Sequence, residues 1–145
     1  MTPEIARGGR GGRLTEEHEA LMEQVDHVTV NVQRAPIETR QVVDALERLF
    51  DLTKSHFSHE EQIMLEMQYQ GLPSHRRDHV YLLEMLRKFI ELAEHDPTHL
   101  TPGIGTSLRS WIALHIKKFD DTYLVWAAEA RDQRPDWPES TPSDC

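Results

Sequence analysis

The sequence contains a single cysteine, Cys145, at its last position. A lone cysteine excludes an internal disulfide and leaves no thiolate cluster for a metal site. The sequence also lacks a long apolar run, and Met1 to Arg13 contains none at all. A signal peptide and a membrane-spanning segment are therefore not predicted, and we expect a cytoplasmic protein.

Positive charge is scarce as well. The chain has 16 lysines and arginines against 25 aspartates and glutamates, a net charge of −9. Nonspecific binding to nucleic acid or to an anionic membrane needs clustered positive charge, so neither partner is expected. With 145 residues, 38% of them hydrophobic, the chain is long enough for one domain with a buried core.

Apolar residues recur at three- and four-residue spacing in four stretches, which predicts amphipathic helices. Prolines and glycines separate these stretches, which cover residues 15–33, 36–69, 73–94 and 101–131. Short connections force neighbouring helices to run antiparallel, so the predicted fold class is all-α, an up-down-up-down four-helix bundle. We assign residues 1–13 to a flexible Gly/Arg-rich arm, 14–131 to the bundle and 132–145 to an irregular tail.

Residues of the kinds that bind metals interrupt the apolar stripes. His56 and Glu60 are four residues apart, as are His75 and His79, so each pair lies within about 40° on one helix face. Burying a lone carboxylate costs several kcal/mol unless it is paired or bound to a metal. The inner stripe around Glu60 contains no lysine or arginine. This pattern favours a metal site.

Single histidines occupy inward positions in the first and last stretches, at His18 and His115. Taken alone, such a histidine is more often a hydrogen-bonded core residue than a ligand. Asp120 follows His115 by five residues, about 140° around an α-helix, so it would have to reach the site from the flank. Seven ligands exceed the four that tetrahedral zinc takes. Imidazole with carboxylate suits iron, manganese or zinc, and two bridged metals would use the whole set.

This set resembles the hemerythrin signature, and more closely that of the bacterial branch of the family. The resemblance extends over about residues 14–126 and includes Trp111, four residues before the last histidine. It implies two iron ions in a bridged non-haem di-iron centre. It places one iron on His75, His79 and His115, the second, with an open position for dioxygen, on His18 and His56, and makes Glu60 and Asp120 the bridges.

The resemblance implies a monomeric protein that binds dioxygen reversibly, for storage or for delivery to an oxygen-consuming partner, and that is not an enzyme. The alternative is an O2 or redox sensor that acts through a separate signalling partner. A di-iron oxidase or peroxide-consuming enzyme is a third interpretation. Catalytic four-helix di-iron sites carry more carboxylates, in two Glu-x-x-His motifs. The present set of five histidines and two carboxylates instead favours reversible binding.

Overall fold

The computed structural model describes residues 10–100, 103–120, 123 and 125–129, of which 10–15, 119 and 120 are described by their backbone alone. Nearly all of this part of the chain is helical. The long helices are α2 (Arg10–Gln33), α3 (Thr39–Glu66), α4 (Leu72–His95) and α5 (Ile104–His115). A 3-10 turn, η1, spans Pro97–His99, and a π-helical segment, η2, spans Ile116–Asp120.

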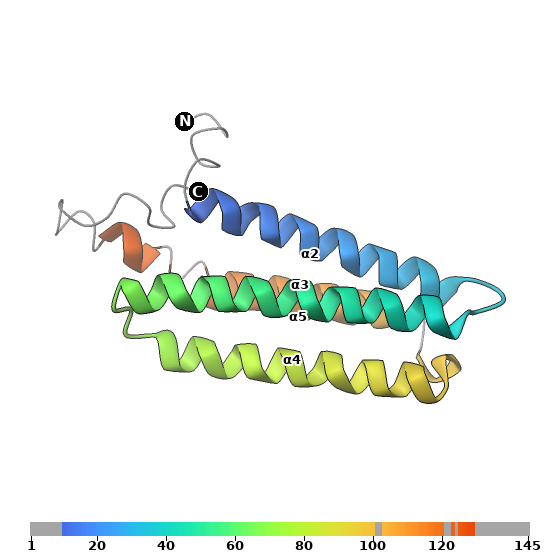
Figure 1. Cartoon of the computed structure of the whole chain (residues 1–145). Helices are drawn as coiled ribbons and strands as arrows, with labels where there is room; N and C mark the ends of the chain where they lie inside the picture. Colours follow the sequence, from blue (N-terminus) through green and yellow to red (C-terminus); the bar gives the residue numbers. More distant parts are fainter. Residues whose placement is uncertain (1–9, 101–102, 121–122, 124, 130–145) are drawn as a thin grey trace.

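The helices form a bundle in which chain neighbours lie side by side (Figure 1). Helix α3 packs against α2 on one side and α4 on the other, and α5 packs against α2. The predicted all-α bundle is confirmed. No helix in the described ranges combines the length and apolar character needed to cross a bilayer.

Several predicted helix boundaries were wrong. The first helix begins at Arg10, inside the predicted flexible arm, because glycine weakens a helix by about 1 kcal/mol but does not break it as proline does. The second helix begins at Thr39, not Pro36, and ends at Glu66, not Tyr69. Residues 1–9 of the predicted arm, the last two residues of the predicted fourth helix and the tail at 132–145 lie outside the described residues.

Helix α3 ends in a Schellman motif, although glycine at position 71 was predicted to stop it. The N–H of Tyr69 donates to the carbonyl of Met64 at 2.9 Å, and the N–H of Gln68 donates to that of Leu65 at 3.1 Å. In this motif the first residue after the helix cap adopts the left-handed conformation. That residue is Gln68, with φ 57°. A glutamine there carries a steric cost that glycine would not.

Replacing Gln68 by glycine should therefore stabilise the protein by about 0.5–1 kcal/mol, raising Tm by about 3 °C. Thermal unfolding followed by circular dichroism measures the change. Gln62, exposed within the same helix, provides the matched control, because Gln62→Gly should lower the stability by about 1 kcal/mol. Equal destabilisation by both substitutions would contradict the assigned cost at Gln68.

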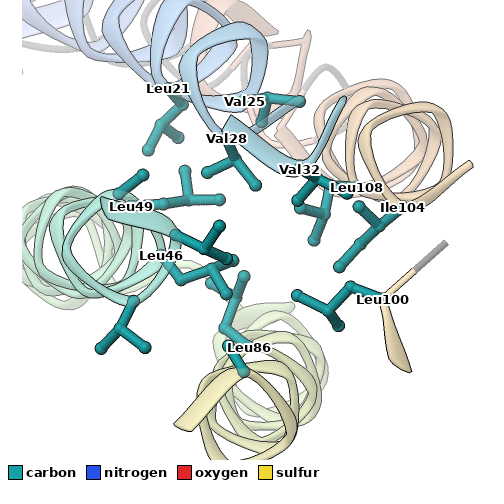
Figure 2. Close-up of a cluster of buried hydrophobic side chains, with 14 of the residues drawn as sticks. Leu21, Val25, Val28, Val32, Leu46, Leu49, Leu86, Leu100, Ile104 and Leu108 are labelled. Atoms are coloured by element: carbon teal, nitrogen blue, oxygen red, sulfur yellow. The ribbon is translucent and has the colours of Figure 1, made fainter. Parts of the chain in front are cut away.

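The main core lies in the half of the bundle away from the α3–α4 turn. Figure 2 shows its side chains converging between the helices. The predicted inner stripes of α2, α3 and α4 supply most of it, including Val25, Leu49 and Leu86. Gly105 lets α5 approach α2 closely, because a Cβ at this position would overlap the Thr29 side chain. A second cluster (Ile63, Met64, Met67, Leu72, Tyr123 and Ala127) closes the opposite end. Those predicted ligands whose side chains the structure describes lie between these two clusters, on the same inner stripes.

Candidate metal centre

The four predicted ligands on α3 and α4 come together inside the bundle because these helices are antiparallel and joined by a short turn. His56 and Glu60 lie towards the end of α3, and His75 and His79 lie in the first turns of α4. All four side chains are buried, with exposed fractions of 1% or less. His115, at the end of α5, is also buried, with an exposed fraction of 3%. His18 on α2 is more exposed, at 19%.

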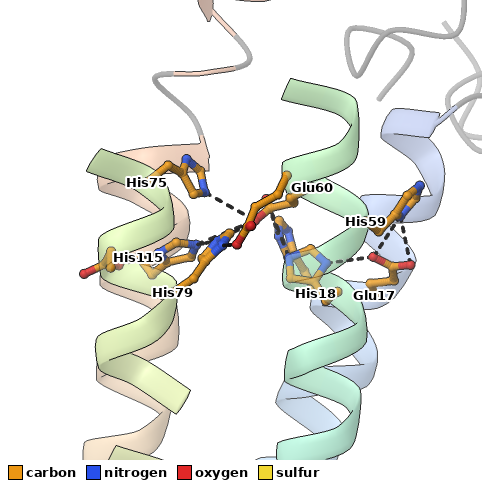
Figure 3. A network of polar contacts seen from close by, with 10 residues as sticks. Glu17, His18, His59, Glu60, His75, His79 and His115 are labelled. Carbon is orange, nitrogen blue, oxygen red and sulfur yellow. Dashed lines mark hydrogen bonds and ion pairs between the residues drawn. The ribbon is translucent and has the colours of Figure 1, made fainter. Parts of the chain in front are cut away.

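Glu60 is the centre of the arrangement, and its two oxygens face different groups of histidines (Figure 3). Oxygen Oε1 is 3.0 Å from His79 Nε2, 3.3 Å from His75 Nε2 and 3.7 Å from His115 Nε2. The Nε2 atoms of His79 and His115 are 3.2 Å apart. These four residues have ligand atoms within 4.8 Å of one another, and we call them the three-histidine half.

Oxygen Oε2 of Glu60 faces the remaining two histidines. It lies 3.6 Å from His56 Nε2 and 4.0 Å from His18 Nε2. The two imidazoles stand edge to face with ring centroids 4.6 Å apart. We call His18, His56 and Glu60 the two-histidine half; their ligand atoms also lie within 4.8 Å of one another. One carboxylate is thus shared by two groups of donors.

The pKa shifts of Glu60 and His79 have the directions expected of metal ligands. Burial raises the pKa of Glu60, but the close contacts of its carboxylate with the imidazoles of His115, His75 and His79 outweigh burial and hold the pKa well below its usual range. Burial lowers the pKa of His79, and the opposing hydrogen bonds to Glu60 and Glu61 do not restore it. An ionised carboxylate beside a neutral imidazole is the combination that binds a divalent cation.

The spacing also fits an ion. Nitrogen and oxygen ligands about 2.1 Å from a common metal lie about 3.0–3.5 Å apart at right-angled or tetrahedral geometry. The contacts from Glu60 to the histidines begin at 3.0 Å and extend to 4.0 Å. Imidazole and carboxylate donors suit first-row transition metals such as iron, manganese and zinc, and not calcium or magnesium. The residues present therefore fit two metal positions that share Glu60.

Asp120 is the one predicted ligand whose side chain lies outside the described residues. Its backbone ends η2, the π-helical segment that follows His115. In a π-helix the repeating contact is i to i+5, so the backbone of residue 120 lies one turn beyond residue 115. The predicted offset of about 140° assumed an α-helix and was wrong for this segment. Its role as a second bridge stays a prediction.

Three carboxylates that were not predicted from the sequence contact the Nδ1 atoms of histidines, on the side of each ring away from Glu60. The Nδ1–H of His56 donates to Glu17 at 2.7 Å, that of His79 to Glu61 at 2.7 Å, and that of His115 to Asp78 at 2.5 Å. Such bonds fix the tautomer so that Nε2 is free to bind a metal, and they make the imidazole more basic. In each pair the carboxylate lies on one helix and the histidine on the next.

His59 belongs to this supporting layer. Its Nδ1 lies 3.2 and 3.3 Å from the two oxygens of Glu17, which also accepts from His56. Burial raises the pKa of Glu17, but the hydrogen bonds from His56 and His59 outweigh it and leave the pKa lowered. His59 is 21% exposed, so it connects the buried layer to the surface. The sequence carried no local signal for this layer, because its contacts join side chains of two different helices.

Removing the charge of Asp78 or of Glu17, two of the three supporting carboxylates, should weaken one half of the centre more than the other. Asp78→Asn should lower metal affinity in the three-histidine half, and Glu17→Gln in the two-histidine half, by about 10–100-fold. A metal titration that resolves two binding steps measures both effects. Glu84→Gln, an exposed change on the same helix as Asp78, is the control. Affinities of Asp78→Asn equal to those of Glu84→Gln would refute the supporting role.

The metal-free protein should lose stability in mild acid. Because the pKa of His79 is lower in the folded chain, the unfolded chain binds more protons below about pH 6.5. The free energy of unfolding should therefore fall as the pH falls from this value through the folded pKa. Urea unfolding at pH 7.5 and pH 5.5 tests this, and His79→Gln should show a shallower dependence. An unchanged dependence in His79→Gln would assign the effect to other groups.

An all-α bundle with imidazoles and a shared carboxylate between its core clusters defines the class as a helical metal-binding protein. The sequence model of hemerythrin, described as the hemerythrin HHE cation binding domain, matches residues 12–127. The chain belongs to the hemerythrin family.

Individual relatives show the same likeness. The chain is 24% identical to a bacteriohemerythrin of Stenotrophomonas maltophilia (strain R551-3), over 76% of this chain and 70% of the relative. It is 32% identical to a myohemerythrin of Sipunculus nudus, over 54% of this chain and 59% of that protein. The chain is also 24% identical to a myohemerythrin of Theromyzon tessulatum, over 77% of this chain and 80% of that protein. No solved structure gives a significant match.

Proposed function

We propose that this chain is a non-haem di-iron protein that binds dioxygen reversibly, for storage or for delivery to an oxygen-consuming partner. The observation that carries the proposal is the division of the Glu60 carboxylate between three histidines at Oε1 and two at Oε2. His75, His79 and His115 would hold one iron, and His18 and His56 the other, with Asp120 as the second bridge. Two ferrous ions bound there would supply the electrons that reversible dioxygen binding requires.

The two halves have different numbers of ligands, which supports dioxygen binding at only one of them. Three imidazoles and a carboxylate oxygen crowd the first position, whereas the second has two imidazoles and one oxygen. The second position therefore has more room for a small ligand. It is also the less buried of the two, because His18 is the most exposed histidine of the set. This accords with dioxygen binding at the two-histidine half.

Buried aromatic and aliphatic side chains lie beside the candidate ligands, and such packing limits the access of water. Phe57, 4% exposed, stacks on His79 with ring centroids 3.7 Å apart and lies 5.2 Å from the ring of His115. Leu21 and Ile63, 2% and 1% exposed, are buried on the stripes that carry His18 and Glu60. A dry site strengthens electrostatic interactions and limits proton leakage. Loss of bound dioxygen as peroxide needs protons, so this packing favours reversible binding.

Binding is favoured over catalysis by the composition of the cluster. Catalytic di-iron bundles use a glutamate from each of two helices and a Glu-x-x-His motif from each of the others. Among the described side chains, the metal-binding groups here contain five histidines and one carboxylate. Neutral donors do less than carboxylates to stabilise the higher oxidation states that O–O cleavage demands. We therefore propose a binding protein.

The test is to reduce the purified protein without air, expose it to oxygen, and record the metal content and visible spectrum together. Two irons per chain and a spectrum that reverses when oxygen is removed would establish the proposal. Rapid, irreversible oxidation would instead favour redox sensing or catalysis. Protein that takes up no iron would refute the cofactor assignment.

A further inference from the structure

Two of the supporting carboxylates, Glu17 and Glu61, accept a hydrogen bond from a second donor besides their ligand histidine. For Glu17 this donor is His59, whose Nδ1 lies 3.3 Å from Oε1 and 3.2 Å from Oε2 (Figure 3). For Glu61 the second donor is Arg76, whose Nε–H donates to Oε1 at 3.0 Å. Each of these carboxylates is therefore held by two side chains.

The two arrangements have the same geometry along the chain. His59 follows His56 by three residues on α3, and Arg76 precedes His79 by three residues on α4. Residues three apart on a helix lie on the same face, one above the other. In both cases a carboxylate of one helix accepts from two donors on successive turns of the next helix. The same arrangement thus occurs once beside each half of the centre.

The second donors restrain carboxylates that lie within reach of water. Glu17 and Glu61 are 26% and 24% exposed, whereas the histidines that they support, His56 and His79, are 1% exposed. Water competes for a single hydrogen bond at such a partly exposed position, and a glutamate has several rotamers open to it. A second donor favours the one rotamer in which the carboxylate also meets the ligand histidine.

The supporting hydrogen bonds determine which nitrogen of the imidazole faces a metal. An ionised carboxylate can only accept, so the Nδ1 atoms of His56 and His79 carry hydrogen and Nε2 is the nitrogen that can bind a metal. The two Nε2 atoms lie 3.6 Å from Oε2 and 3.0 Å from Oε1 of Glu60. If the supporting carboxylate moved away, the ring could rotate or change tautomer, and its metal position would weaken.

We propose that His59 and Arg76 are positioning residues of the metal centre, each acting on one half through the carboxylate that it holds. His59 acts through Glu17 on the two-histidine half, and Arg76 acts through Glu61 on the three-histidine half. Neither residue belongs to the two groups of ligand atoms. The inference rests on the proposed function in that both halves bind a metal, but it does not depend on which metal they hold.

The test compares, at each position, two substitutions of similar shape that differ in the donor. His59→Asn keeps an N–H near the place of Nδ1, and His59→Leu replaces it with a methyl group. Arg76→Gln and Arg76→Met make the same comparison for the Nε–H of the arginine. The controls are His95→Leu and Arg77→Met, at exposed positions of α4.

Two measurements are made on the metal-free protein. Zinc is titrated in by calorimetry, because its binding involves neither dioxygen nor a change of oxidation state. His18→Ala, which removes a ligand of the two-histidine half alone, identifies the binding step of that half. Nitrogen-15 NMR, recorded before zinc is added, reports which nitrogen of each imidazole carries the hydrogen.

His59→Leu should weaken zinc binding in the two-histidine half by about 3–10-fold and reduce the Nδ1–H form of His56. Loss of a supporting carboxylate costs about 10–100-fold, so loss of a residue that acts through it should cost less. His59→Asn and the controls should stay within about twofold of the wild type. Arg76→Met should have the same effects on the three-histidine half and on His79, and Arg76→Gln should again resemble the wild type.

Because His59 acts through Glu17, His59→Leu should add no further loss to Glu17→Gln. Additive losses in that double variant would overturn the proposal, and so would equal losses in His59→Leu and His59→Asn. An Arg76→Met variant that weakened both halves alike would contradict the separate action of the two residues. Protein that shows the expected zinc and NMR results but gives no oxy spectrum with iron would defeat only the proposed function.

Discussion

Replacing Glu60 by glutamine should abolish the paired metal centre while leaving the bundle folded. The substitution preserves the size of the side chain but removes the charge that both halves share, since Oε1 and Oε2 each face histidine nitrogens. Loss of a supporting residue alone costs about 10–100-fold in affinity, so loss of this shared ligand should exceed about 100-fold. Iron analysis after reconstitution should give well under two irons per chain.

Glu47 offers the matched comparison, because it lies on the same helix and is exposed. Glu47→Gln makes the same chemical change without touching the centre and should retain full iron content. Circular dichroism would verify that both variants remain helical. Two irons per chain in Glu60→Gln would mean that this carboxylate does not bridge the halves.

Replacing His18 by alanine should separate the two halves functionally. The three-histidine half uses residues of α3, α4 and α5, so it should keep its iron. The two-histidine half would be left with His56 and one oxygen of Glu60. We expect about one iron per chain and complete loss of the reversible oxy spectrum, measured by metal analysis and visible spectroscopy.

His59→Ala distinguishes a ligand from its supporting layer. His59 contacts Glu17 and lies outside both groups of ligand atoms, so this variant should still bind dioxygen. In the contrary case, His18→Ala would keep its oxy spectrum and the double variant His18→Ala/His59→Ala would lack it. That pair of results would show that His59 completes the second position.

The sequence predicted the parts of the centre that depend on one helix at a time. The four-residue spacings of His56 with Glu60 and of His75 with His79 indicate a shared face whatever surrounds the helix. The structure places these side chains together in the bundle interior. Membership of an all-α bundle followed in the same way from apolar periodicity. Local geometry suffices for such features.

Features that depend on contacts between helices could not be predicted. Glu17, Glu61 and Asp78 each meet a histidine on the following helix, so their partners depend on bundle packing. The end of α3 was missed for a similar reason. Tyr69 packs against Tyr123 and Trp126, and this contact accompanies a left-handed Gln68 that local preference alone would disfavour.

The distribution of donors over the helices makes the two metal positions unequal in a further sense. The three-histidine half is complete on α3, α4 and α5, whereas the two-histidine half depends on α2 for His18 and for Glu17, the support of His56. Displacement of α2 from the other helices would dismantle one position and leave the other intact. Formation of the two-histidine half therefore requires α2 to be packed against the rest of the bundle, whereas formation of the three-histidine half does not.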